Sequence, residues 1–123
     1  QAYRMAGVGP KDMDFAQLYD SFSINPIIYA EDLGLCAKGQ GGAFFADGRT
    51  APGGEFPVNT YGGLMSFGHV GDASGQTMIV EAARQIMGIA GEARQLKKAD
   101  LGVVHCYGGM MSEHATLVLG SAS

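Results

Sequence analysis

The hydrophobic positions of this chain follow two different periods, which predict helices and strands in separate segments. Apolar residues recur at spacings of four, three and four along residues 74–91, as is typical of an amphipathic helix with one buried stripe. The members of this stripe are Ile79, Ala83, Ile86 and Ala90. Residues 101–107 and 116–119 are short runs rich in β-branched and aliphatic side chains, and these predict two strands.

The first third of the chain predicts a helix, a strand and a second helix. Residues 1–7 read as the end of a helix, because Gly7 and the following Gly-Pro pair are stop signals in the expected order. Residues 15–22 are predicted to form a strand. Pro26 suits the first turn of the next helix, since its missing N–H would be unpaired there in any case. The apolar face of that helix consists of Ile27, Ile28, Ala30, Leu33 and Leu35.

Glycine interrupts the pattern in the middle of the chain. We interpret residues 36–60 as one long excursion with a small hairpin, and long loops in compact domains are often functional. Residues 59–75 hold five glycines and present His69 just before the predicted helix, whose N-cap we expect to be Ser74. The complete order of elements predicts an α/β fold with a mixed sheet covered by helices.

Composition narrows the classes of function. The 123 residues are enough for one domain, and the formal net charge is −4 without any block of lysine or arginine. This balance argues against a partner that is nucleic acid or an anionic membrane surface. The two cysteines make no disulfide framework, which favours a reduced, cytoplasmic setting. No signal peptide is visible, and no apolar run approaches the roughly 20 residues of a membrane-spanning helix.

Three side chains beside glycines are candidates for chemistry. His69 could donate a hydrogen bond to a substrate oxygen or carry a proton, or it could simply tie its loop together. Cys106 and Tyr107 end a predicted strand immediately before a Gly-Gly pair, where backbone and ligand can approach closely. Successive strand residues face opposite sides, so we expect at most one of these two to face a cleft. A buried cysteine that behaves as a small hydrophobe is the alternative for Cys106.

Two other patterns carry less chemistry when taken alone. Tyr19 and Asp20 end the first predicted strand, where they fit a core aromatic residue and a turn-capping carboxylate. The histidines and cysteines show neither a Cys-x-x-Cys nor a His-x-x-x-His spacing, so we predict no metal site.

Four segments, in this order, resemble the C-terminal half of a thiolase. They are Tyr19-Asp20-Ser21-Phe22, residues 31–36 with 38–42 (EDLGLC and KGQGG), Pro57-Val58-Asn59-Thr60-Tyr61-Gly62-Gly63 leading to Gly68-His69, and Cys106-Tyr107-Gly108-Gly109. The second and third segments resemble the branch that contains sterol-carrier-type thiolases and thiolase-like lipid-transfer proteins. The resemblance covers nearly the whole chain. We therefore expect residues 1–123 to be an incomplete thiolase C-terminal domain.

This resemblance implies an acyltransferase that acts on acyl-CoA thioesters as a dimer of five-layered subunits. The nucleophilic cysteine of the family lies in the N-terminal half, which would be a further chain segment and a partner of this one. His69 matches the histidine that activates that cysteine and polarises the thioester oxygen. Cys106 matches the cysteine whose thiolate is the acid and base at the substrate α-carbon, a role that nearby donors would support by lowering its pKa. No bound cofactor is implied, because the CoA thioester is the substrate.

The sequence departs from the thiolase pattern around the histidine. Val70 follows His69 where thiolases usually carry proline, and Tyr19-Asp20-Ser21-Phe22 replaces the usual Asn-Glu-Ala-Phe. Two tyrosines, Tyr19 and Tyr107, flanking a histidine are similar to the thiolase-like aldolases of steroid side-chain degradation. Those enzymes cleave a β-hydroxyacyl-CoA by retro-aldol chemistry and work with a partner subunit that carries an OB-fold domain. A phenol can take the β-hydroxyl proton and return one to the enolate.

Two alternatives to a two-half enzyme stay open. The chain could serve a thiolase-like lipid carrier or scaffold without catalysis, or it could be a complete small protein. A half-domain would expose the apolar face that normally packs on the other half, so we expect it to associate with that half or with itself.

Overall fold

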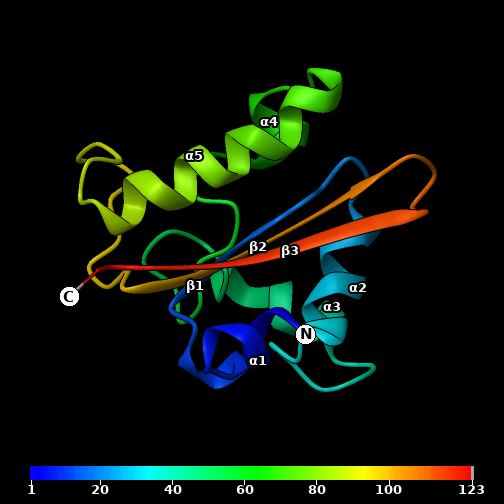
Figure 1. The fold of residues 1–123 in the computed structure, drawn as a ribbon, viewed down its shortest axis with the longest axis horizontal. Coiled ribbons are helices and arrows are strands. Elements are labelled where there is room, and N and C mark those ends of the chain that lie inside the picture. Colours follow the sequence, from blue (N-terminus) through cyan, green and yellow to red (C-terminus); the bar gives the residue numbers. More distant parts are fainter. Residues whose placement is uncertain (123) are drawn as a thin grey trace.

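The computed structural model describes residues 1–122, and its centre is a three-stranded mixed sheet in the order β1-β2-β3. β1 pairs with β2 in parallel, and β2 pairs with β3 antiparallel. The strands are β1 (Phe15–Leu18), β2 (Leu101–Gly108) and β3 (Glu113–Gly120). Figure 1 shows β2 and β3 as one long hairpin that extends well beyond the end of β1. The predicted α/β fold with a mixed sheet is confirmed.

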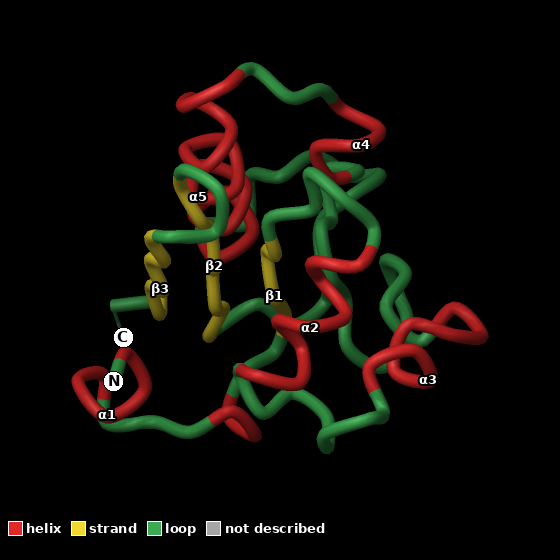
Figure 2. The backbone as a smooth tube through the Cα atoms, turned by 90° about the vertical axis from the view of Figure 1, so that its right-hand side faces the viewer, coloured by secondary structure: helices red, strands yellow, loops and turns green. Residues whose placement is uncertain are grey.

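Helices cover both faces of this sheet. α5 lies across one face, where it contacts β1 and β2, whereas α1 and α2 lie on the other face, against β3 and β1 respectively. Figure 2, which looks along the sheet, shows the same layers, with α3 beyond the β1 edge. The helices are α1 (Ala2–Ala6), α2 (Ile24–Asp32), α3 (Gly41–Phe45), α4 (Gly63–Phe67) and α5 (Ser74–Ile86).

The free edge of β1 is covered by an extended segment rather than by a fourth strand. Ala16 forms a parallel bridge with Val58, and the Ala16 N–H donates to the Pro57 carbonyl at 3.1 Å. The side chain of Asn59 continues this pairing, because its Oδ1 accepts from the Leu18 N–H at 2.7 Å and its Nδ2 donates to the Leu18 carbonyl at 2.9 Å. An amide side chain thus replaces a strand residue at the point where β1 ends.

Two predictions near the first strand and the long loop are wrong. The strand predicted over residues 15–22 ends at Leu18, because the chain leaves the sheet and the Asp20 carboxylate bonds to the backbone of another segment instead. The excursion over residues 36–60 contains the short helix α3 and a 3-10 turn rather than a hairpin. The glycine-rich stretch contains α4, one helical turn that its composition did not indicate.

The buried stripe of α5 lies one residue away from the predicted one. Ala90 is buried as predicted but lies beyond the end of α5, whereas Ile79, Ala83 and Ile86 are only half-buried. The buried positions within α5 are Ser74, Met78, Glu81, Ala82 and Gln85. Two of these are polar and large, and they are buried because they have partners: Thr60 donates to Glu81 at 2.7 Å, and the Leu96 N–H donates to Gln85 at 2.9 Å. Hydrophobicity alone therefore misplaced the stripe.

The cap of α5 also differs from the prediction. Ala73 occupies the N-cap position, and Ser74 is the first residue of the helix. The Ser74 hydroxyl accepts from the Val70 N–H at 2.9 Å, so it holds the preceding loop rather than the first turn of the helix. The loop that carries His69 is therefore fixed to the start of α5.

Candidate active site

A cleft of about 350 Å³ lies at the C-terminal ends of β1 and β2, where α5 begins. The four candidate catalytic residues singled out from the sequence all contribute to it. Its lining consists of Tyr19, His69, Gly71, Asp72, Gly75, Cys106, Tyr107, Gly108 and Gly109. Ligands of α/β folds commonly bind beyond the carboxyl ends of strands, because loops converge there. We refer to this lining as the cleft.

Tyr19 follows directly after β1, and hydrogen bonds fix the chain at Tyr19 itself and at the next residue. Its N–H donates to the His105 carbonyl at 3.0 Å, which adds one more bond to the β1–β2 ladder. The next residue, Asp20, accepts from the Leu64 N–H at 2.7 Å and so fixes the start of α4. Gly63 makes this approach possible: it has a φ of 75°, and a Cβ there would lie 2.9 Å from Asp20 Cγ.

His69 bonds directly to Tyr19. The Tyr19 hydroxyl lies 2.9 Å from His69 Nε2, and the two rings meet edge to face at 87°. On the other side of the imidazole, the Gly71 N–H donates to Nδ1 at 3.4 Å. Since Nδ1 accepts, the neutral ring carries its hydrogen on Nε2 and donates to Tyr19. An Nε2–H donor is the form that can stabilise a developing negative charge on a substrate oxygen.

The ring of Tyr107 packs against Tyr19, but its hydroxyl forms hydrogen bonds with other residues. The two phenol rings lie 4.9 Å apart between centroids. The Tyr107 hydroxyl lies 2.5 Å from the Ser21 hydroxyl, and Asn25 Nδ2 donates to it at 3.4 Å. Ser21 and Asn25 were missed from the sequence. Their spacing of four residues at the start of α2 was the available signal, because residues four apart lie on the same side of a helical turn.

Comparison with known proteins fits this geometry. Residues 1–121 match the family described as thiolase C-terminal domain-like. The chain belongs to this thiolase family. It is 44% identical over 108 residues to the acetyl-CoA acetyltransferase of Methanothermobacter thermautotrophicus, covering 88% of this chain and 28% of that protein.

Two other comparisons extend this family assignment. The domain is 40% identical over 108 residues to sterol carrier protein 2 of Rattus norvegicus, covering 88% of this chain and 20% of that protein. The solved structure of an Ltp2-ChsH2(DUF35) aldolase superposes with a TM-score of 0.86 at 32% identity, covering 98% of this chain and 30% of the other. This thiolase domain thus spans less than a third of the length of these three proteins.

Cys106 lies on the α5 side of the cleft in this thiolase domain. Its sulfur would be 3.6 Å from a Cβ on Gly75, and burial raises the pKa of its thiol above the ordinary value. Burial is the influence that the described residues exert on this pKa, and the acid–base role of Cys106 stays a prediction. Both Cys106 and Tyr107 line the cleft, but their side chains contact different elements, Cys106 beside Gly75 of α5 and Tyr107 at Asn25 of α2. The expectation that at most one of them faces the cleft stays a prediction.

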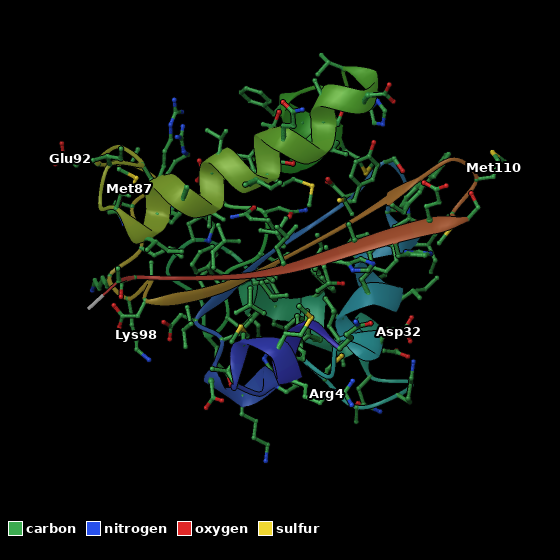
Figure 3. All side chains as sticks on the ribbon, viewed as in Figure 1. Arg4, Asp32, Met87, Glu92, Lys98 and Met110 are labelled. Atoms are coloured by element: carbon green, nitrogen blue, oxygen red, sulfur yellow. The ribbon has the colours of Figure 1, made fainter. Side chains whose placement is uncertain are left out.

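The other cavities of the thiolase domain carry less chemistry. One of about 570 Å³ lies at the opposite end of the sheet near Lys98, whereas the hairpin tip with Met110 marks the candidate active-site end (Figure 3). The cations that line the 570 Å³ cavity include two that already form ion pairs, Lys98 with Asp14 at 2.6 Å and Arg94 with the buried Glu81 at 3.3 Å. Paired charges of this kind make a poor site for an anionic ligand.

Residues 1–122 of the thiolase domain offer neither a metal site nor a membrane span. No three histidine, cysteine, aspartate or glutamate side chains in this range are grouped so that they could hold a metal ion. In the same range, every helix is too short or too polar to cross a bilayer. The cytoplasmic setting stays a prediction.

Proposed function

We propose that this domain supplies the C-terminal half of an active site that forms or breaks a C–C bond next to the carbonyl of an acyl-CoA thioester. The observation that carries the proposal is the convergence of His69, Cys106, Tyr19 and Tyr107 on one cleft of about 350 Å³. Family membership supports the substrate class, because acetyl-CoA acetyltransferase is among the relatives. Acyl transfer and retro-aldol cleavage both pass through an enolate or oxyanion of the thioester, which an Nε2–H of His69 would stabilise.

The first reaction is thiolase-type acyl transfer, with Cys106 as acid and base at the substrate α-carbon. Burial raises the pKa of this thiol, so the protonated form dominates at neutral pH. A protonated thiol suits the cleavage direction, in which the enolate that forms when the C–C bond breaks must receive a proton. The nucleophilic cysteine would come from the N-terminal half.

The second reaction is retro-aldol cleavage of a β-hydroxyacyl-CoA, and the contacts of the two tyrosines favour it. In this reaction the β-hydroxyl loses its proton, the Cα–Cβ bond breaks, and the products are a carbonyl compound and the enolate of a shorter acyl-CoA. The enolate then takes a proton at Cα. Tyr19 and Tyr107 flank the cleft with their rings in contact, and Tyr19 bonds to His69, so a proton acceptor, a proton donor and an oxyanion stabiliser lie together. The similarity to a solved aldolase structure supports this reaction.

The proposal includes partners that complete the site. The domain spans 28% and 20% of two relatives, which supports an N-terminal thiolase half beside it. The homodimer is a further part of the proposal, taken from the resemblance to thiolases. The matched aldolase has two named components, Ltp2 and ChsH2(DUF35), which supports a partner subunit if the reaction is retro-aldol. That this partner carries an OB-fold domain stays a prediction. Light scattering of the protein purified from its native cells, followed by mass spectrometry of the components, tests both expectations. A catalytically silent monomer of this chain would favour the lipid-carrier alternative.

A single substitution separates the two reactions. In the full enzyme, Tyr107→Phe should leave thiolysis of a β-ketoacyl-CoA intact and abolish cleavage of a β-hydroxyacyl-CoA, because only the second reaction needs the phenol. Tyr61→Phe is the matched control, since that buried hydroxyl has no hydrogen-bond partner among the described residues and lies outside the cleft. Chromatography of the CoA products measures both reactions. Retained aldol cleavage in the Tyr107 variant would remove this residue from the mechanism. In a separate variant, His69→Ala, loss of both reactions would support the shared oxyanion role of His69.

A further inference from the structure

Two polar side chains that neither reaction uses lie against the oxygen of Tyr107. Ser21 Oγ is 2.5 Å from this oxygen, and Asn25 Nδ2 lies 3.1 Å from Ser21 Oγ and 3.4 Å from the Tyr107 oxygen. Asn25 is 1% exposed, although it is a polar residue at the start of α2. A buried amide is retained where it has specific partners, and here its partners are these two hydroxyls.

Asn25 fixes the direction of two of the three hydrogen bonds, and the third, between the two hydroxyls, can run from Ser21 to Tyr107. An amide NH₂ can only donate, so Asn25 makes both Ser21 and Tyr107 acceptors. The remaining hydrogen of Ser21 can then be donated to Tyr107. In that arrangement the Tyr107 oxygen accepts from two donors, and its own hydrogen is not needed by either partner. A phenolate oxygen, which only accepts, satisfies both donors fully.

Tyr19 has a different environment. Its hydroxyl bonds to His69 Nε2, and burial, the largest influence on it, raises the pKa of this phenol above the ordinary value. Tyr19 therefore keeps its proton in the resting site. The two phenols in contact with each other are thus arranged for opposite tasks, one to keep a proton and the other to accept one.

We propose that Ser21 and Asn25 are positioning residues that hold the Tyr107 oxygen as a hydrogen-bond acceptor and thereby assign Tyr107 the proton-accepting role. This inference rests on the proposed retro-aldol function. The Tyr107 oxygen takes the β-hydroxyl proton as its own proton passes to solvent, the electron pair of the substrate O–H bond becomes the new C=O bond, and the Cα–Cβ pair moves into the thioester enolate. Tyr19 then gives its proton to Cα, and it regains one from Tyr107 through solvent before the next turnover.

The sequence supports this assignment independently. Within Tyr19-Asp20-Ser21-Phe22, Tyr19 and Ser21 stand where the usual thiolase pattern has asparagine and alanine. Both of these substituted positions contact Tyr107, one through its ring and the other through its hydroxyl. These two departures from the thiolase pattern are therefore concentrated on a single side chain.

The first experiment needs no substrate. In the full enzyme labelled with ¹³C at the tyrosine Cζ position, Tyr107→Phe identifies the Tyr107 signal, and Ser21→Ala should shift that signal because one donor to the oxygen is lost. Ser21→Thr, which keeps the hydroxyl, should restore the wild-type position. Ser66→Ala is the matched control, an exposed serine outside the cleft. An unmoved Tyr107 signal in Ser21→Ala overturns the inference whatever the enzyme catalyses.

The second experiment tests the role in turnover. Ser21→Ala should lower kcat for β-hydroxyacyl-CoA cleavage about tenfold with little change in KM, as expected for one hydrogen bond that acts in the chemical step. Against the residual background turnover of Tyr107→Phe, the same substitution should cause no further loss. Additive losses would overturn the positioning role. If the Tyr107 signal shifts but the wild type cleaves no β-hydroxyacyl-CoA, the contact is real, whereas the retro-aldol reaction and the role assigned to Tyr107 are overturned and acyl transfer remains the proposed function.

Discussion

The Tyr19 hydroxyl and His69 Nε2 lie 2.9 Å apart, although the two residues are separated by 50 positions in the chain. This hydrogen bond joins the end of β1 to the loop before α5. It also places a phenol beside the imidazole in the cleft. The bond is therefore the contact that most directly distinguishes phenol-based chemistry from cysteine-based chemistry in this cleft.

Substitution of Tyr19 by phenylalanine removes this bond and keeps the ring. We expect aldol cleavage by the full enzyme to fall by about 10²–10⁴-fold, the usual contribution of a positioned acid or base. Thiolysis should change much less, because its acid and base is Cys106. The free energy of unfolding should fall by only about 1 kcal/mol, the net value of a typical hydrogen bond. Steady-state kinetics and urea unfolding give the two numbers, and equal losses in both reactions would contradict this division of roles.

The packing of Gly63 against Asp20 predicts an unusually costly glycine substitution. Gly63→Ala forces a side chain into the left-handed region and into the Asp20 carboxylate that caps α4. We expect a loss of about 2–4 kcal/mol in the free energy of unfolding, which combines backbone strain with a broken buried contact.

The control for this substitution is Gly53→Ala. Gly53 has a similar φ of 86°, but nothing among the described residues lies within 4 Å of a Cβ placed there. Only backbone strain applies, so the loss should be about 1 kcal/mol. Chemical denaturation of both variants provides the comparison. Similar losses would show that the contact between Gly63 and Asp20 contributes nothing beyond strain.

The elements with strong local signals could be predicted from the sequence. The strand at 101–107 and the helix that ends at Gly7 were identified because β-branched runs and glycine stop signals act within a few residues. The end of β1 and the buried stripe of α5 could not be predicted in this way. Both depend on partners distant in the chain, Leu64 for Asp20 and Thr60 for Glu81, and no local pattern records such pairs.

The candidate site shows the same division. His69, Cys106, Tyr19 and Tyr107 were found because each lies beside glycines or at a predicted strand end and matches a thiolase segment. Asn25 lies outside those cues, Ser21 lies within a thiolase segment without being singled out, and the contacts of both with Tyr107 span more than 80 residues of sequence. The spacing of four residues between Ser21 and Asn25 shows that the two can lie on one side, but Tyr107 as their common partner is known only from the fold.

Stability of the domain should depend on pH through His105. Burial, with neighbouring His114 as a smaller cause, lowers the pKa of His105 from 6.5 to about 4, while Asp32 acts in the opposite direction. Between pH 6.5 and about 4 the unfolded state binds more protons than the folded state. The contribution of neutral His105 to the free energy of unfolding is therefore complete above pH 6.5 and is lost as the pH falls toward 4. The slope for one proton cannot exceed about 1.4 kcal/mol per pH unit.

Variants at two histidines test this dependence. His105→Gln should flatten the fall in the free energy of unfolding between pH 6.5 and 4, because the titrating group is gone. His105 faces Tyr29, His114 and Thr116, and these groups remain in the variant. His69→Gln, at an exposed histidine, should leave the slope in place. Urea unfolding across this pH range provides the measurement, and an unchanged slope in His105→Gln would assign the acid sensitivity to other groups.

The raised pKa of Cys106 makes its alkylation slow at neutral pH. Only the thiolate reacts, and burial disfavours it both here and at Cys36, the other cysteine. We expect iodoacetamide to modify Cys106 more slowly at neutral pH than a free cysteine peptide, with a rate that climbs in alkaline solution as the thiolate forms. Cys106→Ser isolates the reaction of Cys36, so the difference in mass-spectrometric labelling belongs to Cys106. Rapid labelling of Cys106 in the full enzyme at neutral pH would mean that the N-terminal half supplies donors that stabilise its thiolate, and acyl transfer would then become the favoured reaction.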